Sequence, residues 1–343
     1  MQTLLNTLYL TLPGYLHLDN DTLRFEIERE TKLRVPLHHL SAVVCFGDVL
    51  VSPAAMARLA DEGKTLVLLD RNGRFKARLE GAVSGNILLR QAQFRSADNP
   101  CFCLAQAKSF IAGKLHNSRY VLLRGARDAR QEEDAQLLRD AAQALASSLR
   151  ALGVAPDLDR VRGIEGEAAR RYFAAMAYLV RPDLRADFAP DGRSRRPPRD
   201  RMNALLSFLY IMVMNDCRSG LESVGLDPQQ GLLHAVRPGR AALALDLMEE
   251  FRSVLADRLA LTLVNRGQLK ASDFDLRPGG AVQLADAARK VLIVAYQERK
   301  QELVTHPLLD QKIALGLLPQ LQSRFLARVV RGEAEAYLPF LVH

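Results

Sequence analysis

Four residues in the middle of the chain have side chains that could bind a metal ion. Glu165 lies in GIEGEAARRYF, His234 in GLDPQQGLLHAVRPGR, and Asp246 and Glu249 in LALDLMEEFR. Carboxylate oxygens with one imidazole suit Mg²⁺ or Mn²⁺ better than they suit the zinc of cysteine-rich sites. The chain has a formal net charge of +8. A hard divalent ion on a cationic protein points to phosphodiester chemistry on nucleic acid.

Each of these residues also has a simpler explanation when it is taken alone. Asp246 and Glu249 are three positions apart on a predicted helix and share one face, but that face could simply be solvated. Glu165 lies between two glycines at a predicted helix start, where a carboxylate compensates the helix dipole. His234 lies in a predicted loop or helix start, where a histidine could cap the helix or pack into the core.

Taken together, the four residues predict one pocket, because each lies beside glycine or an apolar run where a solvated side chain would gain little. Glu165, His234 and Glu249 would be the ligands, with Asp246 as a fourth ligand or a supporting residue. Such a site leaves coordination positions open for water and phosphate oxygens, as phosphoryl transfer requires. Arg252 follows the acidic pair and could hold an incoming phosphate.

The bulk composition fits a soluble globular protein that is larger than one average domain. The chain has 343 residues, of which 48% are hydrophobic and 25% charged. Its four cysteines fit neither a zinc ribbon nor a disulfide framework. The beginning of the chain lacks the pattern of a signal peptide, and no segment has the length of a membrane helix. We therefore expect a cytoplasmic protein.

The first part of the chain, residues 1–84, has the pattern of short strands. Residues 16–18 and 22–28 flank the turn signal Asp19-Asn20-Asp21, and residues 42–46 form a short apolar run. A brief helix is expected over residues 53–61, followed by strands over residues 65–70 and 75–79 with a turn at residues 71–73. Short strands joined by tight turns predict a small β-sandwich or barrel.

The pattern changes near residues 84–86, and the rest of the chain, residues 85–343, has a helical period. Helices are expected over residues 104–125, 131–152, 165–180, 202–218, 241–265, 284–305 and 307–331. Residues 202–218 are apolar around nearly the whole circumference, which predicts a buried central helix. The fold class expected is therefore α+β, with a small N-terminal β-domain and a larger helical domain.

Two segments have a polar or apolar character that could serve binding. Residues 184–200 form a loop rich in arginine and proline, which is either a solvated connection or an arm that contacts phosphates. Its candidate DNA-binding residues, together with Arg252, are Arg193, Arg195, Arg196 and Arg199. The last segment, GEAEAYLPFLVH, either packs on the helical domain or docks on a partner.

The order and spacing of several motifs resemble one known family over nearly the full length. These motifs are GIEG followed by RRYF, then GLDPQQGLLHAVRPGRAALALDLMEEFR, then THPLL, together with VCFGDVLVSP near the beginning. They look like the CRISPR-associated adaptation integrase and endonuclease family ("Cas one"). Within that family they look most like the subtype that accompanies type I-C arrays.

The resemblance implies an N-terminal β-sandwich and an all-helical catalytic domain. It implies that Mg²⁺ or Mn²⁺ is held by Glu165, His234 and Glu249, with Asp246 as a companion acid. It implies spacer acquisition, in which the 3′-hydroxyl of a short DNA fragment attacks a CRISPR repeat phosphodiester in a transesterification. The implied partners are DNA, a second copy in a homodimer, and the small adaptation partner "Cas two". The alternatives are a general metal-dependent nuclease acting on branched or duplex DNA, and a non-catalytic DNA-binding protein.

Overall fold

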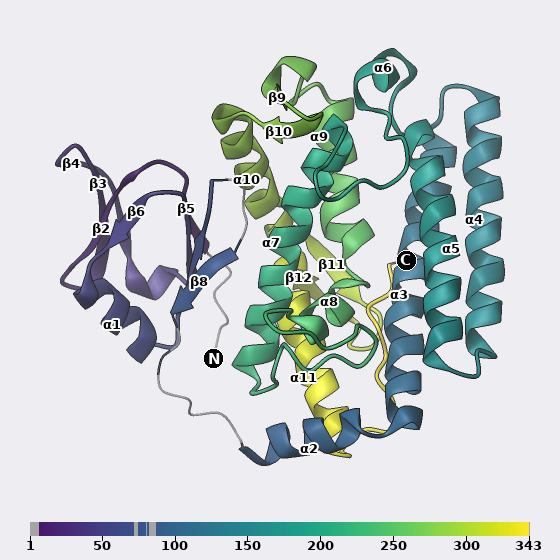
Figure 1. Cartoon of the computed structure of the whole chain (residues 1–343), viewed down its shortest axis with the longest axis horizontal. Helices are drawn as coiled ribbons and strands as arrows, with labels where there is room; N and C mark the ends of the chain where they lie inside the picture. The colour runs from purple at the N-terminus through teal and green to yellow at the C-terminus, as the bar shows by residue number, and fades with distance from the viewer. Residues whose placement is uncertain (1–6, 72–74, 80, 82–86, 343) are drawn as a thin grey trace. The chain divides into compact units, whose positions relative to one another are not determined.

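The computed structural model describes residues 7–71, 75–79, 81 and 87–342 (Figure 1). The chain divides into two compact units, one of residues Met1–Gly85 with Arg289–Gln301, and one of Asn86–Ala288 with Glu302–His343. The change of pattern expected near residues 84–86 falls outside the described residues. The domain boundary after residue 84 therefore stays a prediction, and the short segment 289–301 groups with the first unit.

The first unit contains two four-stranded sheets. One has the order β1-β5-β7-β8, formed by Thr7–Leu10, Ala42–Phe46, Thr65–Leu69 and Phe75–Leu79. The other has the order β4-β3-β2-β6, formed by Glu30–Pro36, Thr22–Ile27, Gly14–Asp19 and Val49–Val51. Buried side chains from both sheets and from helix α1 (Pro53–Asp61) form one hydrophobic core, which includes Leu16, Leu23, Val43, Leu59 and Leu66. The arrangement agrees with the expected β-sandwich.

Local signals in this unit act as the sequence predicts. The turn between β2 and β3 has Asn20 at φ 53°, a conformation that asparagine tolerates better than most residues. Helix α1 begins after Ser52, whose Oγ accepts a hydrogen bond from Ala55 N at 3.2 Å, and Pro53 occupies the first turn. The turn expected at residues 71–73 lies partly outside the described residues.

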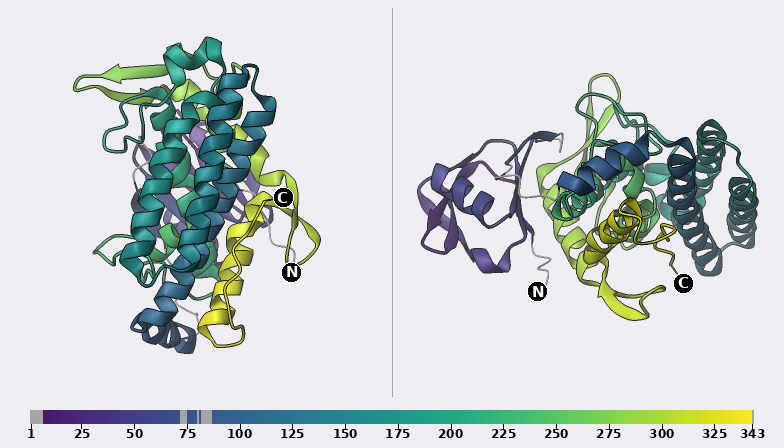
Figure 2. Two further views of the ribbon diagram at one scale, coloured as in Figure 1. Left: turned by 90° about the vertical axis from the view of Figure 1, so that its right-hand side faces the viewer. Right: turned by 90° about the horizontal axis from the view of Figure 1, so that it is seen from below.

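The second unit is mostly helical. Its longer helices are α2 (Ile87–Ala97), α3 (Pro100–Asp128), α4 (Glu132–Gly153), α5 (Leu158–Met176), α7 (Arg201–Ser223) and α11 (Leu318–Val330). Shorter helices are α6 (Arg185–Phe188), α8 (Ala242–Met248) and α9 (Arg258–Asn265), while α10 (Asp286–Gln301) falls largely in the first unit. Helices α3, α4 and α5 pack side by side (Figure 2). Helix α7 packs against α8 and α11 and is buried along most of its length, which confirms the predicted central helix.

Two β-hairpins interrupt the helical pattern, so the mixed α+β class is confirmed but the second unit is not all helical. Strands β9 (Phe274–Arg277) and β10 (Ala281–Leu284) form one hairpin, and β11 (Leu303–His306) and β12 (Gln311–Ala314) form the other. The helices expected over residues 284–305 and 307–331 are therefore wrong in part. In a four-residue strand, the spacing of apolar residues is too short to be distinguished from a helical period.

Among the described residues, no helix has the length and apolar character needed to span a membrane.

Candidate active site

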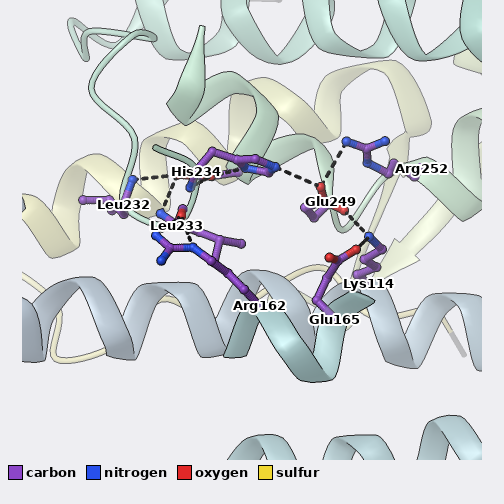
Figure 3. Close-up of polar contacts among 9 residues, drawn as sticks. Lys114, Arg162, Glu165, Leu232, Leu233, His234, Glu249 and Arg252 are labelled. Atoms are coloured by element: carbon purple, nitrogen blue, oxygen red, sulfur yellow. Dashed lines mark hydrogen bonds and ion pairs between the residues drawn. The ribbon is translucent and has the colours of Figure 1, made fainter. Parts of the chain in front are cut away.

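Glu165 lies on helix α5, inside the helix rather than at its start. The helix begins at Leu158 because the Asp157 carboxylate caps it, accepting a hydrogen bond from Arg160 N at 2.8 Å. The predicted start at Glu165 is therefore wrong by two turns, since the glycines on either side of it do not end the helix. The Glu165 side chain is 28% exposed and points toward Lys114 of α3 (Figure 3).

His234 lies in the loop between α7 and α8, and Asp246 of α8 holds that loop. Asp246 is fully buried, and its Oδ2 accepts hydrogen bonds from the backbone N–H groups of Leu232 and Leu233 at 2.6 and 3.0 Å. Its Oδ1 accepts the backbone N–H of His234 at 2.9 Å and lies 2.6 Å from Nδ1 of the same imidazole. Both carboxylate oxygens are therefore occupied in orienting His234.

The orientation of His234 follows from these contacts. An imidazole whose Nδ1–H faces a carboxylate keeps its Nε2 lone pair available for a metal ion or a proton. Nε2 lies 3.8 Å from Oε1 of Glu249. On helix α5, Arg162 donates to the Leu233 carbonyl oxygen from Nη2 at 2.8 Å, so the loop is also tied to the helix that carries Glu165.

The tight packing of the loop explains the glycine at position 231. A Cβ atom added to Gly231 would lie 2.6 Å from Cβ of Ala242 and 2.7 Å from the carbonyl oxygen of His234. Such contacts are shorter than van der Waals distance, so only glycine fits without a shift of the loop.

Glu249 follows the end of α8 and lies between two basic side chains. It is 3% exposed, its Oε2 lies 2.8 Å from Lys114 Nζ, and its Oε1 lies 3.0 Å from Arg252 Nη2. Lys114 also forms an ion pair and a hydrogen bond with Glu165 (Figure 3). Burial by itself would raise the pKa of Glu249, but Arg252 and Lys114 outweigh it and lower that pKa.

Lys114 is the functional residue that the sequence did not suggest. It lies within α3, 51 positions before Glu165, and the two meet only because α3 packs on α5. The ammonium group lies between the carboxylates of Glu165 and Glu249 and, together with Arg252, balances their charge. No motif in the sequence around Lys114 predicts this contact.

A buried acid with two tyrosine partners lies beside this cluster. Asp257 accepts hydrogen bonds from Tyr210 at 2.7 Å and from Tyr172 at 2.9 Å. Burial raises the pKa of Asp257 to about 6, although the tyrosines and nearby arginines act in the opposite direction. The Arg252 guanidinium carbon lies 4.8 Å from the Tyr210 ring centroid, so Tyr210 connects Arg252 to Asp257.

The arginine-rich loop divides into one inward residue and several outward ones. Arg193 donates to Asn203 Oδ1 at 2.7 Å, and its guanidinium carbon lies 5.2 Å from the Tyr210 ring centroid. Arg195, Arg196 and Arg199 are exposed. A small cleft lies next to the cluster. Its lining is largely apolar but includes three basic side chains, Lys114, Arg195 and Arg252.

The structure thus brings Glu165, His234 and Glu249 around one place, with Asp246 behind the imidazole. As they stand, no three His, Cys, Asp or Glu side chains among the described residues form a ready metal cluster, because the Lys114 ammonium separates the two glutamates. The donor types nevertheless fit a hard divalent ion. Glu249 Oε2 is buried, and the Lys114 ion pair gives it no well-aligned hydrogen bond, so that oxygen is available as a ligand.

Comparison with known proteins identifies the family. The sequence matches the family model described as CRISPR associated protein Cas1 over residues 8–298. The CRISPR-associated endonuclease Cas1 1 of Moorella thermoacetica is 54% identical, and the match covers 99% of this chain and 99% of the relative.

Solved structures share the fold at lower identity. A Cas1 protein from Thermotoga maritima has a TM-score of 0.83 at 22% identity, covering 97% of this chain and 99% of that one. A chain of a Cas6-RT-Cas1–Cas2 complex has a TM-score of 0.81 at 24% identity, covering 98% of this chain and 36% of that one. A casposase bound to an integration product has a TM-score of 0.81 at 21% identity, covering 97% and 92%. The structures support the fold, and the sequence matches settle the family: the chain belongs to the Cas1 family of CRISPR-associated endonucleases.

Proposed function

We propose that this protein acts in CRISPR spacer acquisition and joins the 3′-hydroxyl ends of short DNA fragments to a CRISPR repeat in a metal-dependent reaction. The observation that carries the proposal is the proximity of the three side chains: Lys114 bridges Glu165 and Glu249, and His234 Nε2 lies 3.8 Å from Glu249 Oε1. Family membership supports the same activity. Three basic side chains, Lys114, Arg195 and Arg252, line a cleft beside the cluster and would attract a DNA backbone.

Glu165, His234 and Glu249 would hold one Mg²⁺ or Mn²⁺ ion, and Asp246 would support His234 without touching the ion. The supporting role follows from the four contacts that already occupy the Asp246 oxygens. When bound, the ion would supply Lewis-acid polarisation of a phosphate oxygen and neutralise developing charge. The ion carries two positive charges where the Lys114 ammonium carries one, so it would compensate both carboxylates in place of Lys114.

The reaction exchanges one phosphodiester for another. The fragment's 3′-oxygen forms a bond to a repeat phosphorus, the bond from that phosphorus to the repeat's own 3′-oxygen breaks, and the proton leaves one hydroxyl and reappears on the other. Arg252 and the displaced Lys114, which both line the cleft, would contact the phosphate oxygens. No energy-rich cofactor is needed, because the bond broken and the bond formed are of one kind.

DNA, a second copy of this chain and the small adaptation partner Cas2 are the proposed partners. A chain of this fold occurs in a solved Cas6-RT-Cas1–Cas2 complex, and another is a casposase bound to an integration product. Arg195, which lines the cleft, and Arg196 and Arg199, which are exposed on the same loop, are proposed to contact the DNA backbone. Arg193 is turned toward Tyr210. The four cysteines are free thiols, which fits the proposed cytoplasmic location. The sequence motifs support the proposed type I-C subtype.

The test is a strand-joining assay with a duplex oligonucleotide, a supercoiled array plasmid, Cas2 and either Mg²⁺ or Mn²⁺. Glu165→Gln and His234→Ala should abolish joining while leaving the protein folded, because each removes a ligand. Glu167→Gln is the matched control, since Glu167 lies on the same helix but is exposed and pairs with Arg170 and Arg171. Wild-type rates from either ligand variant would refute the site. Shortened strands without joined strands would instead indicate a hydrolytic nuclease.

A further inference from the structure

The backbone changes course at the residues that carry Glu249. Helix α8 ends at Met248, residues 249–251 form turns, and a π-helical segment runs from Arg252 to Asp257. The regular helical hydrogen bonds are therefore interrupted beside the proposed metal ligand. Interruptions of this kind often occur at functional sites, but their free backbone groups need partners elsewhere.

The side chain of Glu250, within this interruption, binds a segment about 90 positions later in the chain. The carboxylate of Glu250, which is fully buried, accepts the backbone N–H of Phe340 at 2.5 Å. It also accepts the Tyr337 hydroxyl, and Gln322 Nε2 lies 3.3 Å from its Oε2. Tyr337 and Phe340 are each 1% exposed, so these two aromatic side chains are part of the core.

The same segment is joined to helix α3 one turn after Lys114. Asn117 donates from Nδ2 to the Glu250 carbonyl oxygen at 2.8 Å and to the Phe340 carbonyl oxygen at 2.9 Å. Its Oδ1 accepts Val342 N at 2.9 Å. Asn117 is completely buried and therefore connects the helix that carries Lys114, the segment that carries Glu249, and residues 340–342.

Close packing reinforces these hydrogen bonds. A Cβ atom added to Gly113, next to Lys114, would lie 2.8 Å from Cβ of Pro339 and 2.9 Å from Cβ of Glu250. Helix α3, the turn at residues 249–251 and residues 337–342 are thus closely packed next to Lys114 and Glu249. A displacement of residues 337–342 would therefore shift both Lys114 and Glu249, because closely packed interiors transmit strain.

We propose that residues 337–342 form a strap that positions Glu249 and Lys114 for metal binding, with Tyr337 and Asn117 as its principal positioning residues. The inference rests on the proposed function, since it concerns the same ligand set. Without the strap, the buried Glu250 carboxylate loses its Tyr337 and Phe340 donors, and the turn at residues 249–251 is free to relax. A ligand moved by a fraction of an ångström binds its ion more weakly and lowers the rate steeply.

The test measures Mn²⁺ affinity by electron paramagnetic resonance, together with the strand-joining rate and the melting temperature. Tyr337→Phe should weaken Mn²⁺ binding about tenfold, since it removes one donor from a buried carboxylate. Leu338→Ala is the matched control: it removes an exposed apolar side chain of the same segment and should leave the affinity unchanged. The Mn²⁺ affinity and the strand-joining rate are both measured well below the melting temperature of each variant.

A second arm uses a variant that ends at Glu335 and a peptide of residues 336–342. The shortened variant should bind Mn²⁺ at least tenfold more weakly, and the peptide should restore affinity and joining, whereas a Tyr337→Phe peptide should restore less. A lower melting temperature in Tyr337→Phe with wild-type Mn²⁺ affinity would overturn the positioning role. If the wild-type protein itself binds no Mn²⁺ through Glu165 and Glu249, the proposed function fails instead, and the two failures are distinct.

Discussion

Lys114 holds together two carboxylates that would otherwise repel each other, and its removal gives the sharpest test of the site. The ammonium lies 2.8 Å from Glu249 Oε2, is bonded to Glu165 as well, and is only 14% exposed. Removal of one partner from such a buried ion pair costs about 3 kcal/mol or more. We expect Lys114→Met to lower the stability of the metal-free protein by about that amount.

The same change should strengthen metal binding. At the proposed site an incoming ion has to displace the ammonium, whereas in Lys114→Met it meets Glu165 without its Lys114 partner and Glu249 paired with Arg252 alone. If the ion recovers the lost 3 kcal/mol, Mn²⁺ affinity rises by up to about 100-fold, since 1.4 kcal/mol corresponds to a factor of ten. Calorimetric titration measures the affinity. Thermal unfolding with and without Mn²⁺ measures how far the ion reduces the difference in stability between Lys114→Met and the wild-type protein.

Lys108→Met is the matched control for this experiment. Lys108 lies on the same helix, but its Nζ donates to the Gly153 carbonyl oxygen at 3.0 Å, away from the acidic cluster. The control should leave Mn²⁺ affinity unchanged. If Lys114→Met binds Mn²⁺ more weakly than the wild-type protein, the ammonium does not stand in the place of the ion, and the reasoning is refuted.

Three further predictions concern residues around the site. Asp246→Asn should weaken Mn²⁺ binding about 10- to 100-fold, because the amide cannot accept all four hydrogen bonds that orient His234, and a calorimetric titration checks this. Gly166→Ala should stabilise α5 by about 0.5–1 kcal/mol in thermal unfolding, since a Cβ there meets no atom within 4 Å. The same change should slow strand joining if DNA approaches this face of α5 closely, and an unchanged joining rate would argue against that approach. Asp257 has its pKa raised to about 6 from 3.8, so it should contribute about 3 kcal/mol of stability that is fully present below about pH 3.8 and is lost as the pH rises through about 6. Denaturant unfolding between pH 4 and 7 should show this slope in the wild-type protein and lack it in Asp257→Asn.

Patterns that depend on neighbouring residues were predictable from the sequence. Helix α1 has the predicted bounds, because Ser52 and Pro53 mark its start locally. The burial of α7 follows from apolar residues around its whole circumference. The types of Glu165, His234 and Glu249 indicated a hard-metal site, and the structure places the three side chains around one centre.

What could not be predicted depends on residues far apart in the chain. The role of Lys114 comes from the packing of α3 on α5, and the four contacts of Asp246 come from the folding of the loop before α8. The expected helix over residues 241–265 is interrupted at residues 249–251, where Asn117 donates to the Glu250 carbonyl oxygen and the backbone N–H of Phe340 donates to the Glu250 carboxylate. A periodicity argument contains no information about such distant partners.

The 337–342 segment has a consequence for how the protein is made. Because the ribosome synthesises the chain from its N-terminus, Lys114, Glu165, His234 and Glu249 all emerge before the partners of Glu250 and Asn117 do. A nascent chain that has passed residue 260 therefore contains every proposed ligand but not the groups that fix the turn beside Glu249. If the strap acts as proposed, competence to cut or join DNA arises only when the last contacts close, so incomplete chains released from stalled ribosomes are poor nucleases.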